Sequence, residues 1–249
     1  MKIIADFHVH SAYSRATSQE MHLKTMARWA GLKGIGLLGT GDFTHPAYFE
    51  EIQTELEETG GGFLRLKSSC HASGVTPPNM KTSSLDERAY FRTKEAEGEP
   101  VHFILTSETS HIYTQAGKGR RVHMMIFAPS LKTVQKINLH LGRIGNVNSD
   151  GRPIFGFSAK DLVKIVLDID PECLVVPAHA WTPWFSVFGS HSGFDSLEEC
   201  FEEETPHIQV IETGLSSDPA MNWRWSALDR LSLISDSDAH SPAKIGREA

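Results

Sequence analysis

The sequence has few cysteines and no long apolar run. Its three cysteines, Cys70, Cys173 and Cys200, are scattered along the 249 residues and form no CxxC pair, which argues against a disulfide framework and favours a reduced, cytoplasmic setting. No apolar run approaches the roughly 18 residues that a membrane span needs. Residues 1–6 have the pattern of a strand rather than of a secretion signal. We therefore expect a cytoplasmic protein without a membrane partner.

The sequence also lacks an excess of positive charge. Its formal net charge is −7, which taken alone argues against a nucleic-acid partner. Thirteen histidines change this interpretation, because histidine is the commonest metal ligand in proteins. Three bound divalent cations would add about +6 and nearly cancel the deficit. The net charge is therefore weak evidence for or against DNA binding.

No repeat of fixed period and no low-complexity linker divides the chain, so we predict one domain over residues 1–249. A different pattern recurs, in which a short apolar run ends in a cluster of aspartate, glutamate or histidine. These runs lie at residues 3–4, 35–38, 101–105, 122–127, 174–176, 208–211 and 231–234. Continuous apolar runs of this length fit strands that are buried on both faces.

Helix-like stretches lie between most of the runs, at residues 46–59, 130–141, 158–169 and 196–203. Pro46 suits the start of a helix, and the other three stretches open on a serine that can cap one. Strand–helix alternation implies parallel strands. Polar clusters at the carboxyl ends of parallel strands are how a barrel builds an active site. The sequence therefore predicts an α/β fold of this kind.

Candidate metal ligands collect at the predicted strand ends. His8 and His10 are two residues apart, so both imidazoles point the same way from an extended strand, and Asp238 and His240 repeat this spacing. The full set is His8, His10, Asp42, His45, Glu108, His123, His179, Asp238 and His240. A single histidine at a strand end is more often structural, but burying so many polar groups is costly unless something binds them.

The candidate ligands offer nitrogen and oxygen, with no thiolate. Such a set suits zinc, manganese or iron better than calcium, and it is too rich in histidine for a plain magnesium site, so magnesium is kept only as an activator. The candidates outnumber the four ligands of one zinc, which predicts two or three divalent ions. Clustered ions can clamp a phosphate, activate a water and stabilise a leaving oxygen.

The segments that carry these ligands resemble the polymerase and histidinol phosphatase (PHP) superfamily. They are Asp6-Phe7-His8-Val9-His10-Ser11, Gly41-Asp42, Glu108, His123, His179 and Asp238-Ala239-His240. The resemblance implies a distorted (β/α)7, TIM-like barrel with a centre of three metal ions. Many members have Asp-His after the second strand, where this sequence has Asp42-Phe43. Either His45 takes the missing role or Asp42 acts alone.

Longer runs resemble the endonuclease Q family within this superfamily. They lie at residues 39–46, 177–185, 192–196, 212–219, 221–224 and 237–242, and the resemblance extends from about residue 2 to the last residue. It implies cleavage of DNA on the 5′ side of a deaminated base (uracil, hypoxanthine or xanthine) or an abasic site. Family members continue with a zinc-binding segment and a further C-terminal region. We therefore expect a PHP catalytic domain that lacks this extension, with any replication or repair partners left open.

Catalytic roles are predicted for Glu108, Asp238 and Asp195. Asp195 is either a general acid or base, a substrate contact, or an ordinary turn or helix-cap aspartate. Glu212 is expected to orient a ligand or to line the pocket.

The predicted substrate contacts are Trp181, Trp184, Phe185, Asn222, Arg224, Lys118, Arg120 and Arg121. The three aromatic residues either stack on a base that is flipped from the duplex or pack over the end of the barrel. The basic residues at 118–121 either hold DNA phosphates or lie in a solvated hairpin turn. The pair at 222 and 224 contacts phosphate or base, or has only a surface role.

Two rival functions use the same features differently. A small-molecule phosphatase needs the metals but not the aromatic loop, and it would release phosphate from small esters. A non-catalytic barrel within a larger repair or polymerase assembly would carry degraded ligands, whereas the set here is intact.

Overall fold

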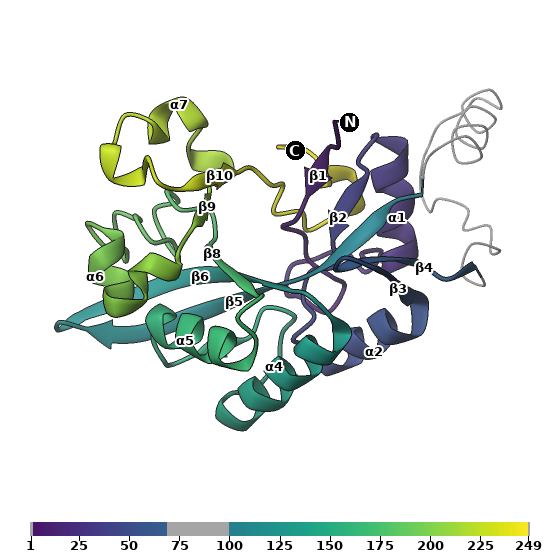
Figure 1. Cartoon of the computed structure of the whole chain (residues 1–249), viewed down its shortest axis with the longest axis horizontal. Coiled ribbons are helices and arrows are strands. Elements are labelled where there is room, and N and C mark those ends of the chain that lie inside the picture. The colour runs from purple at the N-terminus through teal and green to yellow at the C-terminus, as the bar shows by residue number, and fades with distance from the viewer. Residues whose placement is uncertain (1, 69–99, 249) are drawn as a thin grey trace.

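The computed structural model describes residues 2–68 and 100–248, so Cys70 lies outside the described residues. Helices pack around a mixed sheet (Figure 1). The strands are β1 (Ala5–Asp6), β2 (Leu37–Gly39), β3 (Leu56–Gly60), β4 (Phe63–Leu66), β5 (His102–Gln115), β6 (Lys118–Ala128), β7 (Ile154–Phe155), β8 (Leu174–Pro177), β9 (Val210–Glu212) and β10 (Ser232–Ile234).

The longer helices are α1 (Leu23–Leu32), α2 (Pro46–Glu55), α4 (Leu131–Ile144) and α5 (Ala159–Ile169). Shorter helical segments are α6 (Leu197–Phe201), η2 (Glu202–His207), η3 (Gly214–Ser216), α7 (Pro219–Asn222), η4 (Ser226–Leu228) and η5 (Pro242–Lys244). In the two described stretches, no helix is long and apolar enough to cross a membrane.

Each of the seven predicted apolar runs lies in or next to a strand. β1, β2 and β5 lie side by side and parallel, as predicted. β3 and β4, which the sequence did not predict, form a hairpin, and β4 pairs antiparallel with β5. Among the described residues, the result is an eight-stranded mixed sheet.

The prediction of a parallel strand is wrong for β6. β5 and β6 form one long hairpin, and β6 also pairs antiparallel with β8. The chain reverses at Ala116 and Gly117, whose φ angles are 50° and 73°, as a two-residue hairpin turn requires. A turn this short leaves no room for the crossover that parallel strands need. Lys118, Arg120 and Arg121 consequently lie on β6 rather than in the predicted turn.

The last two strands stand apart from the main sheet. β9 and β10 form a parallel pair of their own, and the isolated bridge between Val9 and Ala239 links the segment after β10 to the segment after β1. The described strands therefore form a mixed α/β arrangement, and the predicted closed barrel is not shown. The bridge still brings the two ends of the sequence together, because His10 N–H donates to the Ala239 carbonyl at 2.9 Å.

Helix starts follow the predicted caps. The three serines that precede helices each accept a hydrogen bond from the backbone N–H three residues further on: Ser130, Ser158 and Ser196. The helix that begins at Pro46 ends at Glu55, earlier than the predicted residue 59. Leu56 instead enters β3, where it is buried and pairs with Leu66. Its burial in the sheet outweighs any preference to extend the helix.

The turn after β2 lies directly against the backbone that follows β1. A Cβ atom on Gly39 would lie 2.2 Å from the Phe7 carbonyl oxygen, and one on Gly41 would lie 2.2 Å from that of Val9. Gly41 also has a φ of +66°, which glycine adopts without steric cost. This close approach places Asp42 beside the segment that carries His8 and His10.

Replacing Gly41 should therefore destabilise the fold. We expect Gly41→Ala to lower the free energy of unfolding by about 2–4 kcal/mol, because it combines a left-handed backbone with a steric overlap. Urea unfolding followed by circular dichroism measures the change. The control is Gly156→Ala, since a Cβ there meets nothing within 4 Å. Equal stability of the two variants would contradict the packing described here.

Candidate metal centre

Seven of the nine predicted ligands meet in one continuous site. The structure brings them together as three groups: His8, His10 and Glu108; His10, Asp238 and His240; and Glu108, His123 and His179. Within each group the ligand atoms lie within 4.8 Å of one another. Because His10 and Glu108 each belong to two groups, the groups adjoin and can hold neighbouring ions that share a ligand.

Strand geometry explains why these side chains converge. His8 and His10 flank Val9, whose side chain is buried in the hydrophobic core. Successive side chains on an extended backbone face opposite sides, so both imidazoles face away from that core. On the hairpin, Glu108 pairs with Met125, and His123 lies two residues before Met125 on β6. Glu108 and His123 therefore lie on the same face.

Glu212 at the end of β9 holds two of the histidines. Its carboxylate oxygens both lie 3.0 Å from His8 Nδ1, and one of them accepts the backbone N–H of His179 at 2.6 Å. A carboxylate behind a metal-binding histidine fixes the orientation of the ring and its tautomer. The predicted role of Glu212 in orienting a ligand fits these contacts.

Asp42 occupies the equivalent place behind His10. Its Oδ1 lies 3.1 Å from His10 Nδ1, while its Oδ2 accepts the backbone N–H and the hydroxyl of Ser11. The other ring nitrogen, His10 Nε2, lies 3.1 Å from Asp238 Oδ1. Asp42 is therefore engaged as an orienting group and belongs to none of the three ligand groups.

His45 also lies outside the three groups. Its ring stacks on Tyr13, with a centroid separation of 4.8 Å, and its Nε2 lies 3.2 Å from the carbonyl oxygen of Asn148. Asp42 and His45 both lie outside the three ligand groups, so the choice between them as a metal ligand stays open.

Glu108 is the most heavily contacted group in the site. Its carboxylate lies 2.8 Å from His123 Nδ1, 3.2 Å from His179 Nε2 and 3.0 Å from Arg152 Nη1. Sequence reasoning missed Arg152, which lies in the Asp-Gly-Arg-Pro segment after α4 and before β7. Nothing in that local pattern signals a contact with β5. Its side chain is 25% exposed, so it borders the site on the solvent side.

Burial and charge shift the pKa values of the ligands. Burial alone would lower the pKa values of His8 and His10, but the surrounding carboxylates raise both well above the usual value. Burial would raise the pKa of Glu108, but His123, Arg152 and His8 bring it well below its usual value. Burial lowers the pKa of His123 to about 4 despite the nearby Glu108. The site thus concentrates negative charge that protons or divalent cations must compensate.

One buried ring nitrogen in the site is free to bind a cation. His8 Nε2 is buried and has no hydrogen-bond partner among the described residues, whereas buried polar atoms nearly always have one. Its Nδ1 already faces Glu212, so the free nitrogen points toward Glu108 and Asp238, at 3.5 and 3.7 Å. A nitrogen and oxygen donor set of this kind fits a divalent transition metal.

Several of these residues have strained backbones. Asp42, His179 and Asp238 have φ angles of 49°, 32° and 47°, a left-handed region that residues other than glycine seldom adopt. Such strain persists only where the surrounding structure fixes it, and it concentrates at functional sites.

The aromatic loop after β8 divides into a packed part and an exposed part. Trp181 Nε1 donates to Asn222 Oδ1 at 2.8 Å, and its ring contacts Phe188 and Trp225. Asn222 is buried. The structure therefore gives Trp181 the packing role that the sequence left open, and it buries Asn222 instead of leaving it at the surface.

Trp184 and Phe185 lie against β6 instead. The Phe185 ring centroid is 4.7 Å from that of His123, and the Trp184 side chain is 47% exposed. Trp184 is therefore accessible to solvent, and Phe185 is adjacent to a predicted metal ligand. Both positions suit a substrate contact.

The predicted basic residues also separate. Arg120 is buried, its guanidinium donates to the Gly193 carbonyl, and it lies 4.0 Å above the Phe194 ring. It therefore fixes the loop to the hairpin, and its contact with DNA stays a prediction. Lys118 and Arg121 are exposed on β6, as is Arg224 after α7.

Asp195 is exposed and precedes the cap of α6, where its backbone N–H donates to Glu199 at 3.2 Å. The described residues place it outside the three ligand groups, so its catalytic role stays a prediction.

No family model matches the chain. One similar solved structure is an endonuclease Q complex with a 27-mer duplex substrate that has an abasic lesion at the active site; its TM-score is 0.76 and its identity 28%, over 99% of this chain and 52% of that chain. The lesion-specific endonuclease PfuEndoQ from Pyrococcus furiosus gives 0.75 and 27%, over 99% and 51%. The chain is similar to endonuclease Q along almost its whole length. The resemblance predicted from the sequence is thereby confirmed.

Two further proteins are also similar to this chain. The uncharacterized protein YqxK of Bacillus subtilis is 27% identical over 261 residues, which cover 99% of this chain and 57% of YqxK. A putative metal-dependent phosphoesterase from Bifidobacterium adolescentis has 13% identity and a TM-score of 0.58, over 100% of this chain and 92% of that chain, and shares the fold alone. The chain spans about half the length of each endonuclease Q structure.

Removing the charge of Glu108 should empty more than one metal position, because this carboxylate belongs to two ligand groups. We expect Glu108→Gln to retain at most half of the metal that the unmodified chain retains after dialysis, as measured by inductively coupled plasma mass spectrometry. Glu57→Gln is the control, since Glu57 is a partly exposed carboxylate paired with Arg65 on the β3–β4 hairpin. Equal metal content in all three proteins would contradict a shared ligand.

Replacing Glu212, whose carboxylate orients the His8 ring, should lower the metal affinity without removing a ligand. We expect Glu212→Gln to reduce metal affinity about 10–100-fold, the usual cost of losing such a support. Titration against a competing chelator gives the affinity, and circular dichroism checks the fold. An unchanged affinity in a folded variant would show that Glu212 does not orient His8.

Proposed function

We propose that this chain carries a metal-dependent phosphodiesterase activity that nicks damaged DNA on the 5′ side of a deaminated base or an abasic site. One observation carries the proposal: three overlapping ligand groups lie in a chain that matches endonuclease Q structures along 99% of its length at 27–28% identity. One of those structures holds a lesion-bearing duplex at its active site. A small-molecule phosphatase has weaker support, because the phosphoesterase match is at 13% identity.

We propose that two or three divalent ions bind here, with zinc, manganese or iron as the candidates and magnesium as an activator. The ligands would be His8, His10, Glu108, His123, His179, Asp238 and His240. When bound, such ions activate water and neutralise the charge that develops on a phosphate. Glu212 and Asp42 hold His8 and His10 in the orientation that ligation needs.

The surrounding side chains would complete the phosphate site. Arg152 touches Glu108 and is partly exposed, so its guanidinium is placed to bind a phosphate oxygen at the rim. Asp238 is 30% exposed; burial would raise its pKa, but His8 and His10 bring it well below the usual value. It is therefore ionised at neutral pH and suits ligation better than proton donation. Asp195 remains the proposed general acid or base.

We propose that residues 1–249 form one PHP-type catalytic domain, with the distorted (β/α)7 barrel closing where Val9 meets Ala239. Damaged DNA is its proposed partner.

A nicking assay tests the proposed function. We expect the chain to cut a labelled duplex that contains one uracil or hypoxanthine on the 5′ side of the lesion, when manganese, magnesium or zinc is supplied. Undamaged duplex should stay intact, and His8→Ala should cut at least about 100-fold more slowly because it removes a ligand from the centre. Ionic strength must be fixed, since contacts to phosphate weaken with salt.

Two results would contradict this function. Release of phosphate from small monoesters, with no nicking by this chain or by a version extended at its C-terminus, would favour the phosphatase. Nicking that His8→Ala leaves unchanged would show that the proposed centre is not responsible.

A further inference from the structure

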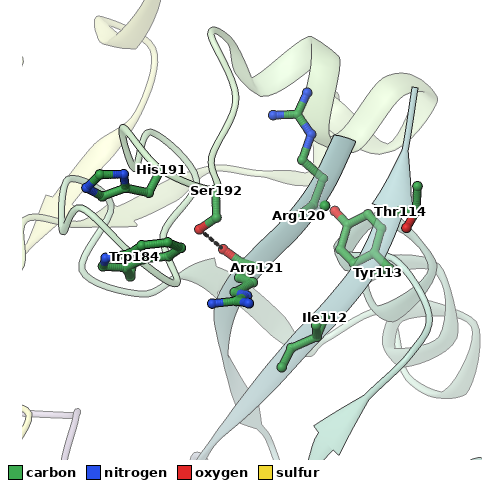
Figure 2. Close-up of a pocket in the computed structure, with 9 residues that line it drawn as sticks. Ile112, Tyr113, Thr114, Arg120, Arg121, Trp184, His191 and Ser192 are labelled. Carbon is green, nitrogen blue, oxygen red and sulfur yellow. Dashed lines mark hydrogen bonds between the residues drawn. The ribbon is translucent and has the colours of Figure 1, made fainter. Parts of the chain in front are cut away.

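A pocket of about 280 Å³ lies between the β5–β6 hairpin and the loop after β8. Its lining is Ile112, Tyr113, Thr114, Gly119, Arg120, Arg121, Trp184, His191 and Ser192. Figure 2 shows Trp184 and His191 side by side on the loop, with Arg121 extending from the hairpin toward them. Sites for drug-sized ligands usually measure about 300–1,000 Å³, so this pocket suits one small planar group.

The pocket lies on the face of the hairpin that carries the metal ligands. Arg121 is two residues from His123 along β6, and its cross-strand partner Ile112 is four residues from Glu108 along β5. Side chains separated by two or four residues on a strand share a face. Two residues advance a strand by about 7 Å, so Arg121 begins roughly that far from His123. This spacing is on the scale of one nucleotide.

Phe185 fills the space between the metal ligands and the pocket. Its ring centroid lies 4.7 Å from that of His123, and the Arg121 guanidinium lies 5.7 Å from the same ring. Its carbonyl accepts the His123 backbone N–H at 3.0 Å. The ring is thereby fixed beside a metal ligand and lies between the metal centre and the pocket.

The pocket combines a partly exposed tryptophan ring with a cation. Trp184 stacks on His191 at a centroid distance of 4.5 Å and an interplanar angle of 16°, and Arg121 lies 5.2 Å from the Trp184 ring. Trp184 still exposes nearly half of its side chain. A nucleobase can stack on such a ring, and the guanidinium beside it can bind a phosphate.

The wall of the pocket is held rigidly. Ser192 Oγ donates to the Arg121 carbonyl and the Ser192 carbonyl accepts the Arg121 backbone N–H, at 3.3 and 3.2 Å. Arg120 is fixed to the Gly193 carbonyl. A wall that is ordered before binding lowers the entropic cost of holding a ligand.

We propose that this pocket binds one unpaired nucleotide next to the phosphodiester at the metal centre, with its base stacked on Trp184 and a phosphate on Arg121. The proposal rests on the proposed function and deepens it, because it assigns where the strand runs after it leaves the metals. It predicts a DNA path along the exposed face of the hairpin, from Glu108 toward Thr114.

Binding and hydrolysis together test this path. We expect Trp184→Ala to weaken the binding of a fluorescein-labelled single-stranded oligodeoxynucleotide about tenfold in fluorescence anisotropy with calcium, and Trp184→Phe to restore most of the affinity because phenylalanine retains a stacking face. Arg121→Ala should lower the slope of log affinity against log salt by about one, as the loss of one phosphate contact requires. Arg143→Ala, an exposed arginine on α4, is the matched control and should leave affinity and slope unchanged.

Hydrolysis of bis(4-nitrophenyl) phosphate separates the pocket from the metal centre. This small diester has no nucleobase and no second phosphate, so Trp184→Ala and Arg121→Ala should raise the KM for lesion-bearing duplex by a much larger factor than the KM for the diester. Unchanged oligonucleotide affinity in both variants would overturn the pocket proposal even if the chain nicks DNA. No oligonucleotide binding by the unmodified chain would overturn it as well. Failure to nick with intact oligonucleotide binding would instead count against the proposed function alone.

Discussion

The buried Glu108 carboxylate is the group on which the site depends. Histidines from β6 and from the loop after β8 contact it, and Arg152 reaches it from the segment before β7. A buried carboxylate is tolerated only when positive charge and hydrogen bonds compensate it, so these distant segments must come together for the chain to fold. The same requirement makes the place attractive to divalent cations, which supply that compensation more fully than histidines alone.

The sequence predicted those parts of the structure that local geometry determines. His8 and His10 converge because alternate side chains on a strand share a face, and the serine caps act within one helical turn. Local geometry does not determine the direction of a strand, because a buried apolar run has the same pattern in a parallel and in an antiparallel pair. The informative signal was the Ala116–Gly117 turn and the lack of a helix before β6. The resulting hairpin aligns the metal ligands with the pocket, which seven parallel strands would not do.

The residues whose roles needed the structure are those whose partners lie far away in the sequence. Asp42 was predicted as a ligand, but its position depends on how closely the turn after β2 approaches the backbone that follows β1, and its carboxylate contacts His10 Nδ1. Trp181 and Trp184 look equivalent in the sequence. The bond from Trp181 to Asn222, 41 residues further on, and its ring contacts with Phe188 and Trp225 distinguish the packed ring from the exposed one. Arg152 carries no local pattern at all, so spacing arguments could not have found it.

The most direct test of this account is anomalous diffraction from crystals grown with manganese, recorded near the manganese absorption edge. We expect two or three anomalous peaks beside the three ligand groups, with neighbouring peaks sharing Glu108 or His10 as a ligand. A single peak, or peaks located away from Glu108, would contradict a centre built around that carboxylate.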